Sequence, residues 1–539
     1  MAKLTRPQPP AHQTPLKQYH FEISIDRLRR GIDNVRHDVH ISHDFQRMAN
    51  RLSFQLILHH AQISPPFRTE ARFHWHNETT EFKRLCHEIL LHGINTAKAG
   101  HELQIDILAQ VSVVKLLSET IGHQFDETVQ HLKTVIRRHE LADRMEPPLA
   151  LREEVATVIQ RKDQIVRSVG TDIFQYFTEV QNELNKLRIS NFGEKSVIPR
   201  EIFSNPILQS TGQINGFFLI ENYVLIGHRI EDPVNYNTLF NLFINFLSEH
   251  YGAALQATGT RSAMPAQSRR IKPEITNMTD AYRPELDGMV KHVANIDLLF
   301  NFFKTQEALK KNPNRQTEEN QKEKLKARAR AQKERLNQFY RIVSKELMIE
   351  GIVAPYLMQP VFNEYCPPLS PQECLQYLVI PKARKPVVRK LNRFKEYYSR
   401  SFSLAPLSQT VRHIKRTSKT DRQKYLIRFL TDFARYHRDL MNYQVLKDTE
   451  DSINLRTEEK SIRLSRENQT LYEFILPHEQ AAEASRINNH SVLKADIRGS
   501  SAIIDHMKEK QQNPATSFSL NFFDPVNNVL SLYGAQKIF

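Results

Sequence analysis

The residues of this chain that could do chemistry lie close together near its end, where a short apolar stretch stops at an aspartate. Asp496 is followed by Ile497, Gly499, Ser500 and Ser501, and then by a segment with helical periodicity. A carboxylate at the end of a strand supplies the hard oxygen ligand that Mg²⁺ prefers, usually together with substrate phosphates. Gly499 lets the backbone approach a ligand closely, and the free amides at the start of a helix attract anions. The pattern therefore suits a metal–phosphate site.

The same residues also fit a simpler arrangement without a ligand. Ser500 or Ser501 could act only as the cap of the following helix, because hydroxyl side chains accept hydrogen bonds from the first amides. Asp496 would then be an ordinary turn residue at the end of a strand. The local pattern alone leaves both interpretations open.

Three short segments carry a resemblance to a known family. Residues 495–501 (ADIRGSS), 521–525 (NFFDP) and 533–538 (YGAQKI) follow one another in the order and spacing found at the start of a class III nucleotidyl cyclase catalytic domain. This is the adenylate and guanylate cyclase family, and the resemblance covers residues 491–539. It implies an α/β, ferredoxin-like domain of which this segment forms the first strand and helices.

The resemblance also implies roles for single residues. Asp496 matches the first of the two metal-binding aspartates of the family, and Ile497 matches the residue whose backbone carbonyl contacts a metal. Gly499, Ser500 and Ser501 match the turn whose amides hold the phosphates of a nucleoside triphosphate. In the family, two Mg²⁺ ions stabilise the attacking and leaving oxygens as the cyclic nucleotide forms, and the domain works as a dimer.

The chain departs from the family pattern in one important respect. Arg498 and Ser500 differ from the commonest residues only where the backbone makes the contact. The second metal aspartate, however, would follow Phe539, and so would the residues that read the base and stabilise the transition state. We therefore expect these 539 residues to be inactive alone, and the codons after Phe539 to supply the missing aspartate. The choice between ATP and GTP stays open.

The rest of the chain is predicted to be mainly α. Fifteen glycines in 539 residues are under half the usual proportion, which argues against many tight turns. Apolar residues recur every three or four positions, as on one face of a helix, over long segments. These segments are 103–136, 155–187 (one helix, ending before Asn191), 239–247, 289–303 and 336–347. Residues 217–226 fit either a buried strand or a short helix.

The predicted organisation is a multi-helical body followed by a helical stalk and the cyclase-like segment. Composition and periodicity divide the chain as follows: a disordered arm (1–17), a helical N-terminal region (18–255), a linker (256–280), a helical region with a basic segment (281–420), a stalk (421–476) and the cyclase-like segment (491–539).

The stalk is predicted from two helical patterns. Leu426, Phe429, Phe433, Tyr436, Leu440 and Tyr443 follow the alternating spacing of a heptad seam. A second helix is predicted from Thr457 to Leu476, with Leu464, Asn468, Leu471 and Ile475 on one stripe. By the resemblance, the stalk and the cyclase domain would form a homodimer. The alternative is a helix hairpin packed within one chain.

Charge is concentrated in one part of the sequence. Residues 382–428 contain fifteen Lys or Arg against two acids, while the whole chain carries +15. Aromatic residues alternate with the charges there, so the segment could bind an anionic partner such as nucleic acid or an acidic membrane surface. On this hypothesis the protein is a non-catalytic helical scaffold. The alternative is a solvated basic face whose aromatic side chains point into the core.

Other features limit the compartment and the cofactors. Cys86, Cys366 and Cys374 form no paired framework, which suggests a reducing environment. No stretch reaches the roughly 18 uncharged apolar residues of a membrane span, and the N-terminus lacks a signal-peptide pattern. We therefore expect a cytoplasmic protein without a membrane span. The spacings of the 23 histidines predict no metal site, so Mg²⁺ is the only expected cofactor.

Overall fold

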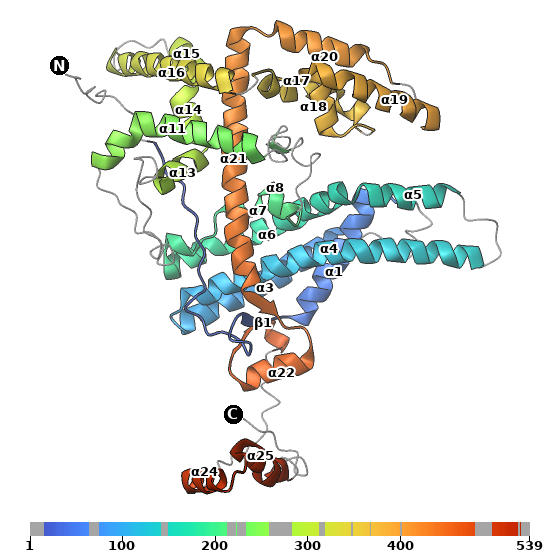
Figure 1. Ribbon diagram of the computed structural model, residues 1–539, viewed down its shortest axis with the longest axis vertical. Helices are drawn as coiled ribbons and strands as arrows, with labels where there is room; N and C mark the ends of the chain where they lie inside the picture. The colour runs from blue at the N-terminus through green and yellow to red at the C-terminus, as the bar shows by residue number, and fades with distance from the viewer. Residues whose placement is uncertain are drawn as a thin grey trace. The chain divides into compact units, whose positions relative to one another are not determined.

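The computed structural model describes residues 16–63, 75–141, 149–212, 222–223, 233–257, 283–311, 319–346, 349–366, 368–398, 402–479, 498–526 and 529. The chain divides into two compact units, Met1–Glu479 and Gln480–Phe539. The described residues are mainly helical and include one small parallel sheet, which confirms the prediction of a mainly α protein (Figure 1). Most of the predicted arm and linker, and nearly all of 217–226, lie outside the described residues.

Four long helices build the first core of unit 1. They are α1 (His43–Ala61), α3 (Trp75–Ala99), α4 (Leu103–Leu141) and α6 (Lys162–Phe192), and each packs against the other three. The apolar face predicted for 103–136 is buried from Val111 onward, so the helical period of the sequence correctly identified the inward side.

The helix predicted over 155–187 is interrupted once. α5 (Leu149–Gln160) ends before Arg161, and α6 begins at the next residue. Backbone hydrogen bonds still cross the junction, from Arg161 N to Thr157 O (3.0 Å) and from Ile165 N to Arg161 O (2.9 Å). α6 ends at Phe192 and is followed by Gly193, slightly beyond the predicted end.

The second core gathers shorter helices from the middle of the chain. α11 (Pro233–Ala257) buries the apolar residues of the predicted helix over 239–247, which confirms that prediction. The segment predicted as helical over 289–303 falls in three helices, α13 (Arg283–Lys291), α14 (Ala294–Phe300) and α15 (Phe302–Lys311). α16 (Glu319–Glu346) packs on α15 and α14.

Smaller elements complete unit 1 before its last long helix. A short series follows α6: η1 (Glu194–Ser196), α7 (Arg200–Phe203) and α8 (Pro206–Gln209). A third core is built by α17 (Ile349–Tyr365), α18 (Pro371–Val379), η3 (Pro381–Ala383), α19 (Arg384–Tyr398) and α20 (Ala405–Arg416). Ser370 and Glu373 form a reciprocal capping box that begins α18.

α21 (Lys419–Asp451) connects the second core to the first. With 33 residues it is about 50 Å long, and Figure 1 shows it running past the other helices toward the sheet. The residues of the predicted heptad seam that lie nearest its start, Leu426, Phe429, Phe433 and Tyr436, are buried in the second core. Leu446, near its other end, belongs to the first core. The seam is therefore packed within one chain, as in the alternative that the sequence left open.

The second helix predicted for the stalk is wrong. α22 (Glu459–Glu467) has nine residues, and Gln469 then takes a left-handed backbone conformation with φ of 55°. Leu471–Phe474 is a strand, β3, not a continuation of the helix. The strand forms because the backbone of this segment pairs with another strand, which outweighs the helical spacing of its apolar residues.

The sheet joins distant parts of unit 1. β1 (His37–Ile41) lies in the centre, between β2 (Ile453–Leu455) and β3, and both neighbours run parallel to it. All five residues of β1 are buried. A strand from the start of the chain is thus hydrogen-bonded on both sides to strands that follow α21, which closes unit 1 on itself.

Asp38 places a carboxylate inside this sheet, fully shielded from solvent. Its Oδ1 accepts hydrogen bonds from Arg456 Nε (2.9 Å) and Asn454 Nδ2 (3.1 Å). Its Oδ2 accepts from Ser465 Oγ (3.0 Å) and from the backbone N of Ile32 (3.1 Å). These four donors, of which the Arg456 guanidinium is also a cation, compensate the burial of the carboxylate, which would otherwise be unfavourable.

Lys115 of α4 binds the end of α21. Its Nζ donates to the carbonyl oxygens of Glu450 (3.0 Å) and Ile453 (2.7 Å), which suits the negative end of a helix. The neighbouring carboxyl group of Glu450 is buried, and this burial raises its pKa to about 7. The first core, α21 and β2 therefore meet around one lysine and one carboxyl group.

Unit 2 is described over a short range. It contains α24 (Ser500–Glu509), α25 (Pro514–Phe518) and a π-helical turn (Ser519–Phe523). The strand expected to end at Asp496 lies outside the described residues. In the part of the chain that the structure describes, no helix is both long and apolar enough to cross a membrane.

Replacing Asp38 should destabilise unit 1 strongly. Asp38→Ala leaves the Arg456 guanidinium and three other hydrogen-bond donors, of which the Ser465 hydroxyl is buried, without their acceptor, and breaking a buried pair costs about 3–5 kcal/mol. Urea unfolding followed by circular dichroism measures the loss. Asp126→Ala, which removes an exposed ion pair with Lys162, is the control and should cost under about 1 kcal/mol. Equal losses in the two variants would contradict a central role for Asp38.

Glu450 should make the stability of the protein depend on pH. Its pKa is about 7 in the folded chain against an ordinary value of 4.5, so the folded state binds more protons between these values and loses stability as pH rises through them. The loss approaches about 3 kcal/mol above pH 7. Glu450→Gln should therefore match the parent at pH 5 and be more stable at pH 8.

Urea unfolding at both pH values tests this expectation. Asp451→Asn, an exposed neighbour, is the control and should change stability by under about 0.5 kcal/mol at either pH. If the free energy of unfolding of Glu450→Gln differed from that of the parent by the same amount at pH 5 and at pH 8, burial would not raise the pKa of Glu450.

Candidate functional site

The structure describes Gly499, Ser500 and Ser501, the turn residues that the resemblance assigns to phosphate binding. Gly499 has a φ of 74° and is the N-cap of α24, which begins at Ser500. No described heavy atom lies within 4 Å of the position that a Cβ on Gly499 would take. Glycine therefore suits this position because of its left-handed backbone and not because of crowding.

The two serines lie in the first turn of the helix and do not occupy the capping position. Ser501 is exposed and Ser500 is partly exposed, so solvent and solutes reach this end of α24. A ten-residue helix whose first turn is open to solvent presents unpaired amides and the positive end of its dipole. Asp496 and Ile497 lie outside the described residues, so their metal-binding roles stay predictions.

The basic segment forms the outer surface of the third core. The apolar residues of α19 and α20 point inward, and Leu391, Leu407 and Ile414 are buried. Eight cationic side chains are exposed and make no ion pair with any residue that the structure describes: Lys382, Lys385, Arg389, Arg393, Arg412, Lys415, Arg416 and Lys419. No acidic side chain in the described ranges pairs with these eight cations, so they carry a positive field.

Three aromatic residues of the basic segment whose side chains the structure describes, Phe394, Phe402 and Tyr425, contact other aromatic rings of unit 1. The Phe402 ring lies 6.1 Å from the Tyr365 ring and 6.0 Å from the Phe394 ring. Tyr425 stacks on Tyr356 at 5.5 Å. These rings stabilise the fold and are not displayed for stacking on bases, as the alternative interpretation of the segment proposed.

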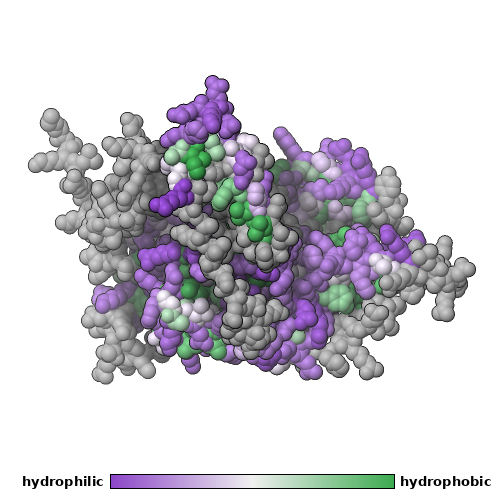
Figure 2. All heavy atoms as spheres, turned by 90° about the horizontal axis from the view of Figure 1, so that it is seen from below, coloured by the Kyte–Doolittle hydropathy of each residue, from purple (hydrophilic) through white to green (hydrophobic). Residues whose placement is uncertain are grey.

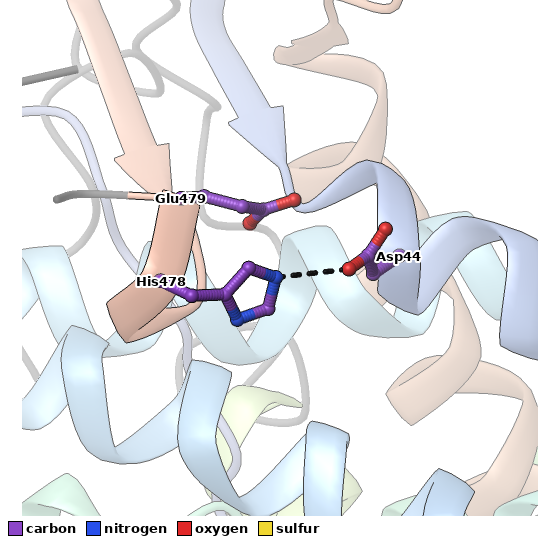
Figure 3. A group of neighbouring side chains, drawn as sticks. All are labelled: Asp44, His478 and Glu479. Atoms are coloured by element: carbon purple, nitrogen blue, oxygen red, sulfur yellow. Dashed lines mark hydrogen bonds and ion pairs between the residues drawn. The ribbon is translucent and has the colours of Figure 1, made fainter. Parts of the chain in front are cut away.

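A third group of polar residues lies where strands β1 and β3 end. Parallel strands bring their carboxyl ends to one edge of a sheet, where binding sites commonly form. Ser42 and Asp44 follow β1, and His478 and Glu479 follow β3. Figure 3 shows the side chains of Asp44, His478 and Glu479 gathered at this edge, and their ligand-type atoms lie within 4.8 Å of one another.

Hydrogen bonds hold this group in place. His478 Nε2 lies 3.0 Å from Asp44 Oδ2, and the Asp44 carboxylate also accepts from Arg47. These hydrogen bonds, that from Arg47 first, hold the pKa of Asp44 below its usual value. Glu479 Oε1 accepts from Ser42 Oγ (3.0 Å), and Oε2 accepts from the backbone N of Leu476 (2.9 Å).

Sequence reasoning missed this group because its members come from opposite ends of unit 1. Asp44 and His478 are separated by 434 positions, and only the pairing of β1 with β3 brings them together. His37 and His40 lie in β1 and His43 opens α1, so their spacing of three residues does not place them on one helix. Buried His40 has a lowered pKa because of its burial, and its ring lies 4.9 Å from that of His43.

Comparisons with known proteins do not identify a family. No protein-family model matches the chain, and neither a curated protein nor a solved structure was found to be similar to it. The resemblance of residues 491–539 to nucleotidyl cyclases therefore depends on the residues named above.

Proposed function

We propose that this chain is a cytoplasmic signalling protein whose last segment, 491–539, is the first part of a class III nucleotidyl cyclase-like domain. The observation that carries the proposal is the left-handed Gly499 at the solvent-accessible start of α24. A positive φ at this glycine fits the expectation that the backbone here can approach an anionic ligand closely at the start of a helix.

The proposed contacts follow from helix electrostatics. Phosphate oxygens would accept hydrogen bonds from the amides of Gly499, Ser500 and Ser501, where the helix dipole favours negative charge. Asp496 would supply a carboxylate and Ile497 a carbonyl to Mg²⁺, which in the family is bound as two ions. The metal would bridge the phosphates and neutralise their charge. Catalysis needs a second carboxylate beyond these residues.

Exposed apolar side chains in unit 2 support the idea that more structure packs on it. Ile503, Val526 and Val529 are 37–53% exposed. A complete domain, or the second subunit of a homodimer, would cover them. Because the α21 seam is buried in its own chain, we place the proposed dimer contact in the cyclase-like segment and not in the stalk.

The proposed site can be tested with the full chain. Phosphorus NMR of ATP, of GTP and of inorganic triphosphate detects weak binding as line broadening, which should require Mg²⁺ and be lost in Asp496→Asn and Gly499→Val. The glycine substitution should act because a β-branched residue disfavours a positive φ. Asp505→Asn, on the same helix, is the matched control and should bind like the parent. Broadening that persists unchanged in both site variants would exclude the proposal.

A second candidate function is supported by the eight exposed cations around α19 and α20. On this proposal the helical body is a scaffold that binds an anionic partner through residues 382–428. Binding would be mainly electrostatic, since the rings of Phe402 and Tyr425 pack against Tyr365 and Tyr356 of the same chain. It would therefore weaken steeply as salt concentration rises.

Charge reversal tests the cationic surface. The triple variant Lys385→Glu, Arg389→Glu, Arg393→Glu should lower affinity for duplex DNA, RNA or acidic vesicles and, for duplex DNA, reduce the salt slope by roughly 2–3. The matched control reverses Lys322, Lys324 and Lys326, which are exposed on α16. Absence of binding to all three probes at low salt would rule out this function.

A further inference from the structure

We propose that Asp44, His478 and Glu479 form a binding site for a divalent transition-metal ion of the Zn²⁺ type. The site lies at the carboxyl edge of the parallel sheet and shares no residue with the Mg²⁺ site proposed at Asp496 (Figure 3). It contains one imidazole nitrogen and two carboxylates, which come from two segments that the pairing of β1 with β3 brings together.

The spacing of the ligand atoms suits such an ion. His478 Nε2 and Asp44 Oδ2 are 3.0 Å apart. Tetrahedral Zn²⁺ with bonds of about 2.0–2.1 Å holds neighbouring ligand atoms roughly 3.3 Å apart. The ion can therefore replace the proton between the two side chains with a small outward movement. The third ligand is Glu479, and its carboxylate oxygen lies within 4.8 Å of the ligand atoms of Asp44 and His478. Rotation of the exposed His478 side chain can shorten these distances to those of a bound ion.

Neighbouring groups already orient the third ligand. Ser42 Oγ donates to Glu479 Oε1, and the backbone N of Leu476 donates to Oε2, so the carboxylate is held at the sheet edge. Ser42 itself is fully buried and also accepts a hydrogen bond from Phe45 N at the start of α1. Hydrogen bonds of this kind around a metal ligand fix its direction and contribute to affinity.

The ligand types select the ion. Mg²⁺ requires a nearly octahedral shell of oxygen ligands, whereas a mixed imidazole and carboxylate set favours Zn²⁺, Co²⁺ or Ni²⁺. Three protein ligands leave a fourth position for water, which reaches the site because His478 is 64% exposed. Arg47 contacts the other oxygen of Asp44, and its positive charge opposes metal binding.

Metal binding would fasten the last residues of unit 1 to its first long helix. Asp44 lies in the first turn of α1, while His478 and Glu479 follow β3 and end the unit. An ion shared by them would hold the segment after β3 against the edge of β1. The expected consequence is slower amide hydrogen exchange over residues 471–479 when the ion is present.

Titration of the untagged full chain with Co²⁺ tests the site, because Co²⁺ in a tetrahedral N/O site has visible absorption. We expect one equivalent to bind, to be displaced by Zn²⁺, and to bind at least tenfold more weakly in His478→Ala and in Asp44→Asn. Ser42→Ala should weaken binding to a lesser degree, and Arg47→Ala should strengthen it. Asp496→Asn should leave the band unchanged, which separates this site from the proposed nucleotide site.

His123→Ala is the matched control, since His123 is an exposed histidine 3.6 Å from a glutamate elsewhere on the surface. It should bind Co²⁺ like the parent. Binding that is absent in the parent, or that is equally strong in His478→Ala, overturns the proposal, and so does an equal loss in His123→Ala. Circular dichroism of each variant confirms that the exposed substitutions leave the fold intact.

Discussion

The buried carboxylate of Asp38 is the constraint on which unit 1 depends. It lies in the central strand and is neutralised by Arg456, which follows β2, and hydrogen-bonded by Ser465 of α22. An uncompensated charge at this depth would be very unfavourable, so β1 reaches its place only when the segment after α21 is also in place. The Asp38 carboxyl group also explains why residue 31 is a glycine. A Cβ on Gly31 would lie 2.3 Å from the carboxyl carbon of Asp38, which is too close for atoms that are not bonded.

This closure gives α21 its role. The helix is buried in the second core over its first turns and in the first core near its end, and Lys115 binds its terminal carbonyls. β2 follows the end of α21 along the chain, so the helix connects both cores to the sheet. The long helix is a rigid connection within one chain, so no second chain is needed to bury its apolar seam.

The carboxyl edge of the sheet collects polar groups for the same topological reason. Parallel pairing places the residues after β1 next to those after β3, and it does so whatever their separation along the chain. The last residues of unit 1 thus contact the start of α1 through His478 and Glu479. Any ion bound there would act at the point where the chain leaves the helical body, ahead of the proposed nucleotide site.

The sequence by itself determined the features that depend on near neighbours. Helical period and scarce glycine predicted α4, α11 and most of α6, and Gly499 with its following serines predicted the turn that begins α24. For the basic segment 382–428, the sequence allowed two interpretations, and aromatic side chains that point into the core were one of them. These features depend on residues that are close together in the sequence, so the spacing of apolar residues predicts them directly.

Tertiary structure decided the rest. Residues 471–474 have helical spacing but form a strand, because pairing with β1 satisfies their backbone groups in a way that local propensity does not reveal. The heptad seam of α21 is compatible with two chains or one, and only the second core shows which side chains fill it. Asp44 and His478 lie 434 positions apart, so their meeting depends entirely on the parallel register of the sheet. The spacing of residues along the sequence does not predict which strands pair or in what register.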